Sequence, residues 1–158
     1  MKTALYVATV ARTYRKAIDD YLKSPELYRE NMEWYKSEIG KCTYREFTTG
    51  FYFHKPDATT QIYDSNTYVK NYTYLGTVEA VREDGLVRIE QKNKFSVGET
   101  VEIMKPDGRN LEKEVAAICD EEGNPVESAP HPKQVLYVDL GADAECGDII
   151  RRSEMEAD

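Results

Sequence analysis

The chain has few of the residues that build metal sites and active sites. Among its 158 residues there are only two histidines, His54 and His131, and neither has a ligand-spaced neighbour. The three cysteines are scattered and form no Cys-x-x-Cys pair, so they cannot complete a usual four-thiolate iron–sulfur site. The sequence also lacks a phosphate-binding glycine loop, a Gly-x-Ser-x-Gly turn and a His-Glu-x-x-His motif. It therefore predicts no catalytic residue, no metal and no cofactor within this chain.

Long hydrophobic runs are also missing. No stretch approaches the ~20 apolar residues of a membrane span, so we expect no membrane partner. The first ten residues imitate a signal peptide, but Thr9 interrupts the apolar run, and Arg12, Arg15 and Lys16 follow at once. The odd number of cysteines argues against a disulfide framework, which suits a reducing compartment. These features predict a cytoplasmic protein.

Positive charge is scarce. The 21 Lys and Arg residues face 29 Asp and Glu residues, which gives a net charge of −8. Such a surface disfavours nucleic acid as a partner of the whole molecule, but a local basic patch stays possible. The length suits one ordinary domain, or a small domain with an appendage.

The clearest pattern in the chain is a strand meander over 74–105. Val87 and Ile89 alternate with polar residues, and so do Val101 and Ile103. This period of two is typical of half-buried strands. Asp84-Gly85 is a hairpin signal, because glycine reaches positive φ without a steric penalty. A meander of this kind needs further strands to cover its apolar face and its edges.

The later residues supply those strands. A run over 134–140 is a clear strand, whereas 111–119 favours a strand without excluding a helix. Two similar turns, Val97-Gly98-Glu99 and Cys146-Gly147-Asp148, each lead into β-branched residues. Sharp turns that launch strands suit a small closed barrel. We therefore predict a mainly β fold, α+β overall, and expect Pro130-His131-Pro132 to be extended.

The N-terminal residues predict a helical arm. An amphipathic helix is expected over 4–23, without an evident N-cap, and Ser24-Pro25 should end it. Asn31 should cap a second helix that continues through Ile39, with Trp34 and Ile39 buried and Gly40 as a left-handed end. The predicted units are the arm over 1–43, the barrel over 44–152 and a frayed acidic tail over 153–158.

The apolar face of the first helix has no evident partner within the chain. It is wider than one short helix could cover, so it suggests another part of a longer protein or another copy of the chain. Its interface residues recur at spacings of three and four: Val7, Val10, Tyr14 and Ile18.

Aromatic and basic residues are interleaved in the middle of the chain. Aromatic rings beside cations on a β-barrel can stack the bases of single-stranded nucleic acid, although the rings can equally fill the barrel. The loop over 91–95 is the best contact candidate, unless its aromatic residue is tucked beneath it. His131, between two prolines, is either a catalytic base or, as the prolines favour, a rigid surface corner. Arg45 belongs either to a recognition edge or to a cross-strand ion pair with Glu46. The candidate binding residues are Arg45, Tyr52, Lys92, Asn93, Lys94, Phe95 and His131.

Four blocks of the sequence resemble the C-terminal part of peptidase family U32, the collagenase-like group. They are YVATV-x-x-x-YRKAID over 6–19, REFTTGFYF over 45–53, RIEQKNKFSVGETVEI over 88–103 and APHPKQ over 129–134. The resemblance implies a β-barrel like the second domain of elongation factors, preceded by a TIM-barrel-like catalytic domain that this chain lacks. It also implies a parent that is either a collagen-degrading peptidase or an enzyme that hydroxylates transfer or ribosomal RNA. No catalytic residue of the family can be carried over to this chain.

Three functions follow from these observations. The first is a non-catalytic accessory module that positions a substrate, RNA or peptide, for the missing catalytic domain. The second is a structural module that stabilises the enzyme or its oligomer, including a homodimer formed through the first helix. The third, hydrolysis by this chain itself, ranks last because no nucleophile, metal set or activated pair is visible.

Overall fold

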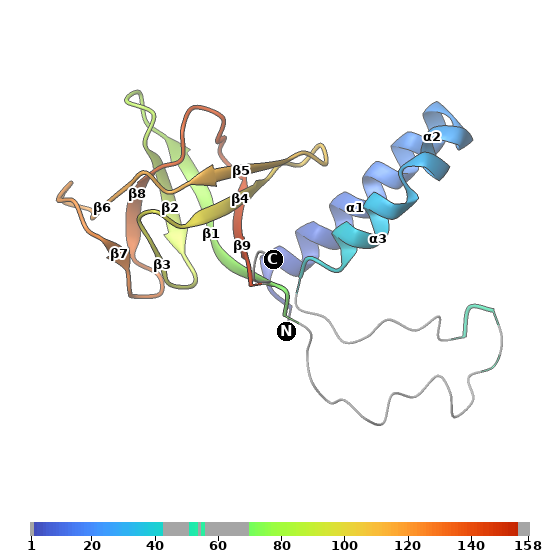
Figure 1. The fold of residues 1–158 in the computed structure, drawn as a ribbon, viewed down its shortest axis with the longest axis horizontal. Coiled ribbons are helices and arrows are strands. Elements are labelled where there is room, and N and C mark those ends of the chain that lie inside the picture. The colour runs from blue at the N-terminus through green and yellow to red at the C-terminus, as the bar shows by residue number, and fades with distance from the viewer. Residues whose placement is uncertain (1, 43–50, 54, 56–69, 155–158) are drawn as a thin grey trace.

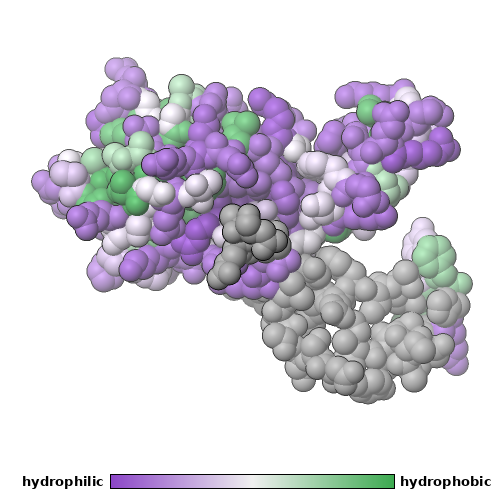
Figure 2. Space-filling view, viewed as in Figure 1, coloured by the Kyte–Doolittle hydropathy of each residue, from purple (hydrophilic) through white to green (hydrophobic). Residues whose placement is uncertain are grey.

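The computed structural model describes residues 2–42, 51–53, 55 and 70–154. It consists of a helical arm and a curled β-sheet that stand side by side (Figure 1). The face of the molecule in Figure 2 is mainly hydrophilic over the sheet and over the outer end of the arm. No helix among the described residues is long and apolar enough to cross a membrane.

Seven antiparallel strands form the main sheet, in the order β5-β4-β9-β1-β2-β8-β6. A separate pair of short strands, β3 and β7, lies against it. The strands are β1 Tyr72–Val81, β2 Val87–Gln91, β3 Phe95–Ser96, β4 Thr100–Met104, β5 Asn110–Glu114, β6 Ala117–Cys119, β7 Ser128–Ala129, β8 Val135–Asp139 and β9 Ile149–Ser153.

The sheet curls so far that its two edge strands, β5 and β6, are joined directly by the chain. Strands β5 and β6 are consecutive, yet β5 pairs with β4 and β6 pairs with β8 at the other end of the sheet. The N–H of Val115 donates to Glu99 O at 2.9 Å, and that of the next residue, Ala116, donates to Asp139 O at 3.1 Å. Two neighbouring residues thus donate backbone hydrogen bonds to opposite edges of the sheet, one next to β4 and one at the end of β8. The predicted mainly β barrel with a helical arm is confirmed in this form, and 111–119 is strand rather than helix.

The core fills the inside of the curl. Val87, Ile89, Val101 and Ile103 are all buried there, as the alternation predicts. Gly76 is required where β1 and β2 approach closely, because a Cβ atom there would lie 2.8 Å from the backbone oxygen of Glu90. The register of β1 also shifts on both sides of this region, which bends the strand.

Two local predictions in the sheet are wrong. The alternation with Val101 and Ile103 predicts that Glu102 faces solvent, but Glu102 is buried and pairs with Arg151. The segment at His131 is a turn rather than extended chain, since Gln134 N donates to His131 O at 3.3 Å and Lys133 has a φ of 67°.

The arm consists of α1 Ala4–Lys23, α2 Pro25–Glu30 and α3 Met32–Ile39. Ser24 ends α1, as predicted, and its side chain also caps α2. Contrary to expectation, α1 has a cap, because the Thr3 side chain accepts a hydrogen bond from Tyr6 N. Gly40 is right-handed, with a φ of −80°, so the left-handed end was wrong.

The buried residues of α3 also differ from the prediction. Tyr35 and Glu38 are buried, whereas Trp34 and Ile39 are half-buried. Tyr35 and Glu38 face inward because they hydrogen-bond to groups of α1 and the sheet, which a hydrophobicity pattern does not reveal.

The arm is seated on the sheet by a small apolar cluster. Leu5 and Cys42 from the arm side pack with Tyr74, Met104 and Ile149 of β1, β4 and β9. The predicted boundary at 43/44 falls among residues outside the described ranges.

Candidate binding site at the junction of arm and sheet

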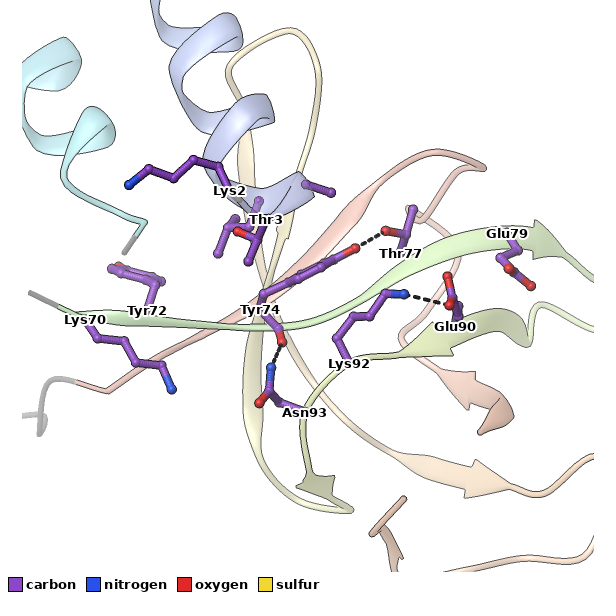
Figure 3. A pocket seen from close by; sticks show the side chains of 12 residues that line it. Lys2, Thr3, Lys70, Tyr72, Tyr74, Thr77, Glu79, Glu90, Lys92 and Asn93 are labelled. Atoms are coloured by element: carbon purple, nitrogen blue, oxygen red, sulfur yellow. Dashed lines mark hydrogen bonds and ion pairs between the residues drawn. The ribbon is translucent and has the colours of Figure 1, made fainter. Parts of the chain in front are cut away.

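An open groove lies where the start of α1 meets strands β1 and β2. Its volume is about 740 Å³, and its residues come from three parts of the chain (Figure 3). The start of the arm contributes Lys2 and Thr3, β1 contributes Tyr72 and Tyr74, and the region after β2 contributes Asn93. The groove therefore exists only because the arm and the sheet are docked.

Two tyrosines of β1 form an aromatic wall of the groove. The Tyr74 hydroxyl lies 2.6 Å from the Thr77 hydroxyl, which fixes the direction of its ring (Figure 3). Arg151 and Lys41 lie over the Tyr72 ring, at 4.9 and 5.5 Å from its centroid. Both tyrosines are mostly buried, so only a small part of each side chain is open to a ligand.

Lysines surround this aromatic wall. Lys2 lies above Tyr72 and Lys70 below it in the view of Figure 3. Lys92 Nζ lies 2.6 Å from Glu90 Oε1, and this hydrogen bond raises the pKa of Lys92. Glu79 and Glu90 also line the groove, so its end near Lys92 is mixed in charge and its end near Tyr72 is cationic.

The loop after β2 is held rigidly at the edge of the groove. The Asn93 side chain donates from Nδ2 to Tyr74 O at 2.6 Å, and Lys92 N donates to Leu75 O at 2.7 Å. Gln91 Nε2 donates to Asn93 O at 3.1 Å. These bonds place Lys92 and Asn93 beside the tyrosines without further ordering of the loop.

The predicted binding residues do not all gather at this groove. Lys92 and Asn93 line it. Lys94 is exposed in the same loop, with its carbonyl 3.3 Å from Arg152 Nη1. Phe95 is buried in the core, which gives it a packing role there.

The other predicted residues lie elsewhere. Tyr52 is exposed, and His131 is exposed in the turn between β7 and β8. Arg45 lies outside the described residues. Lys2 and Thr3 also line the groove and are not among the predicted residues, because no sequence pattern places the start of α1 beside strands about 70 residues later.

A buried network of charges holds the arm in the position that forms the groove. Glu38 of α3 pairs with Arg12 of α1 and, at 2.7 Å, with Arg151 of β9. Arg151 Nε also donates to Glu102 Oε1 at 2.5 Å. Asn110 Nδ2 adds a hydrogen bond to Glu38 Oε2 at 2.9 Å. The network thus links two helices of the arm to three strands of the sheet.

The network fixes the protonation state of its carboxylates. Burial alone would raise the pKa of Glu38, but Arg151 and Arg12 outweigh it, and the pKa lies below its usual range. Asp20 behaves similarly: burial opposes ionisation, yet hydrogen bonds from Lys16, Tyr35 and Asn31 lower its pKa. Burial and the bond to Asp20 raise the pKa of Tyr35 to about 12.

The groove presents ammonium, hydroxyl, amide and carboxylate groups at its surface. The groove residues donate hydrogen bonds and carry positive charge, but they include no cysteine, serine or histidine. Among the described ranges, no three His, Cys, Asp or Glu side chains group as metal ligands. The three cysteines are free thiols.

Two family models match the chain. The model described as Peptidase family U32 C-terminal domain matches residues 70–151, which contain all nine strands except the end of β9. The model described as Peptidase family U32 matches residues 1–62, which contain the helical arm.

Curated relatives align with almost the whole chain. A protein named tRNA hydroxylation protein P1, from Bacillus subtilis (strain 168), is 35% identical over 141 residues, which are 89% of this chain and 33% of the relative. The tRNA hydroxylation protein P of Escherichia coli (strain K12) is 27% identical over 145 residues, 91% of this chain and 31% of the relative. The chain therefore spans about a third of the length of the curated relatives it matches.

A solved structure is also similar. The C-terminal domain of a Geobacillus thermoleovorans protein described as a U32 peptidase aligns with a TM-score of 0.47 and 26% identity. The alignment covers 51% of this chain and 99% of that chain.

Proposed function

Because the chain belongs to peptidase family U32, we propose that it is a non-catalytic accessory module that holds an RNA substrate for a reaction performed elsewhere in a family-length protein. The observation that carries the proposal is the groove, where Lys2, Lys70 and Lys92 surround Tyr72 and Tyr74. Cations beside aromatic rings suit the phosphates and bases of a single strand. The names of the relatives, which refer to tRNA hydroxylation, favour transfer RNA over a peptide.

The geometry limits the strength and the type of contact. Tyr72 and Tyr74 are mostly buried, so we expect edge contacts and hydrogen bonds rather than deep stacking. The net charge of −8 repels a polyanion from the rest of the surface. The isolated module should therefore bind RNA weakly and in one place.

A titration of the chain with transfer RNA at low salt tests the proposal. We expect the double variant Lys70→Gln, Lys92→Gln to bind at least several-fold more weakly, because two phosphate contacts are lost. Lys36→Gln is the matched control, since Lys36 is exposed on α3 and lies outside the groove. Equal binding by the chain, the double variant and the control would overturn the proposal.

A second arm of the same experiment separates RNA from peptide. Gelatin peptides replace the transfer RNA, with the same variants and the same buffer. Binding of peptide that depends on Lys70 and Lys92, without binding of RNA, would show an accessory module for a peptidase instead.

A further inference from the structure

Helix α1 turns its polar side inward and its apolar side outward. Its buried positions include Thr9, Arg12, Thr13 and Asp20. Its large apolar side chains are exposed, with Val7 at 58%, Tyr14 at 61% and Ile18 at 51%. A helix of a globular protein usually buries its apolar stripe instead. We call the exposed face, formed by Val7, Tyr14, Ile18 and Tyr21, the outer stripe.

The polar contacts prevent α1 from rolling to bury the outer stripe. Arg12 Nη1 donates to Lys105 O at 2.8 Å and to Asn110 Oδ1 at 2.9 Å. Tyr35 donates to Asp20 at 2.7 Å. Rolling the helix would leave these buried groups without partners, which is costly. The outer stripe therefore stays on the surface of this chain.

A hollow beside the outer stripe enlarges the apolar surface. It has a volume of about 200 Å³ and lies between α1 and α3, where Tyr14 forms part of its wall. Met32 and Ile39 line it from α3, and Tyr28 from α2. A bulky apolar side chain of a partner could enter this hollow while the partner covers the stripe.

We propose that the outer stripe is the docking surface for the remainder of the U32 family domain in family-length proteins. The arm matches that domain's model over 1–62, whereas the strands match the separate C-terminal domain model over 70–151. The relatives align with the arm and the strands together, and they are about three times as long as the aligned segment. The arm thus belongs to the U32 family domain, and its polar side contacts the sheet, which belongs to the U32 C-terminal domain.

A second copy of this chain is the weaker candidate for the occupant. Each copy carries a net charge of −8, and the repulsion between two such chains opposes their association. Both the docking proposal and the proposed function assume a family-length protein with a further domain. The docking proposal does not depend on RNA binding.

The experiment compares one substitution in two proteins. Tyr14→Lys is made in this chain, and a lysine is placed at the aligned position of the full-length Bacillus subtilis relative. In this chain the melting temperature should hardly change, because Tyr14 is exposed. In the full-length relative it should fall by several degrees, because the lysine would be buried in the interface. Arg15→Ala, next to Tyr14 and outside the stripe, is the control in both proteins and should be neutral.

Each other outcome also decides the question. An unchanged melting temperature of the lysine variant in both proteins would overturn the proposal. Sedimentation that shows a dimer of this chain, converted to a monomer by Tyr14→Lys, would make a second copy the occupant and would also overturn it. If the lysine variant of the relative does not accumulate, Ile18→Ala at its aligned position takes its place. None of these results depends on the transfer RNA titration, so either proposal can fail alone.

Discussion

At the scale of single residues, Glu38 connects more elements of the fold than its single carboxylate would suggest. Its carboxylate is buried and contacts Arg12, Arg151 and Asn110, which belong to α1, β9 and β5. One acidic side chain thus joins three elements that are distant in sequence. The two buried guanidinium groups depend on it for their charge balance.

Removal of this charge should therefore destabilise the protein strongly. We expect Glu38→Gln to lower the free energy of unfolding by about 3–5 kcal/mol, because it leaves Arg12 and Arg151 buried with too little negative charge. Urea denaturation followed by circular dichroism measures this. Glu33→Gln on the same helix is the control, since Glu33 is exposed and should leave the midpoint unchanged. A midpoint for Glu38→Gln that equals the control would contradict the assigned role.

At the scale of elements, the arm and the sheet meet through ionisable groups, so their docking should depend on pH. The pKa of Glu38, which joins the arm to the sheet, and that of Asp20, which joins α1 to α3 within the arm, both lie below their usual ranges in the folded protein. A lowered pKa contributes stability that is present above the unfolded value, near pH 4, and is lost as the pH falls through the folded value. Acid should therefore release the arm.

The single tryptophan reports this release directly. Trp34 lies on α3, and its ring faces the turn between β4 and β5, where a Cβ atom added at Gly108 would lie 3.5 Å from it. We expect Trp34 fluorescence to change cooperatively below pH 4, while the strand signal in circular dichroism changes less. The control is Asp107→Asn at an exposed turn, which should leave this transition in place. A Trp34 signal that is flat down to pH 2 would contradict the prediction.

At the scale of the whole molecule, the acidic surface and the cationic groove act against each other. Lys2, Lys70 and Lys92 place positive charge at the groove, beside the carboxylates of Glu79 and Glu90, on a chain with a net charge of −8. Release of counterions from about three phosphates gives a slope of about −2 in a plot of log affinity against log salt. Anisotropy of labelled transfer RNA at several salt concentrations measures the slope. A much steeper slope would mean that other cations of the chain also bind, and a slope near zero would contradict an ionic groove.

Much of the fold was predictable because local signals carried it. The alternation at Val87, Ile89, Val101 and Ile103 predicted strands, and all four residues are in the core. Ser24-Pro25 marked the end of α1, and glycine marked the turns of the sheet. Three residues of the predicted stripe of α1, Val7, Tyr14 and Ile18, are exposed, whereas the fourth, Val10, is half-buried. The role of this stripe as an interface stays a prediction, as do the binding roles of Lys92 and Asn93.

The buried charges were not predictable, because they depend on partners that are far away in sequence. Glu102 alternates with apolar residues as a solvent-facing residue would, and only the arm that packs on β4 buries it. Arg12 likewise belongs to the polar side of an amphipathic helix. A periodic pattern tells which side chains share a face, but it does not tell what that face meets.

The sequence by itself determined where the helices and strands lie and which side chains share a face, because these depend on neighbouring residues and on the period of the backbone. The tertiary structure alone decided which face of α1 turns inward and which residues form the groove. The physical reason is that burial and charge pairing arise between segments some 70 to 110 residues apart, as Arg151 with Glu38 and Lys2 beside Tyr72 illustrate.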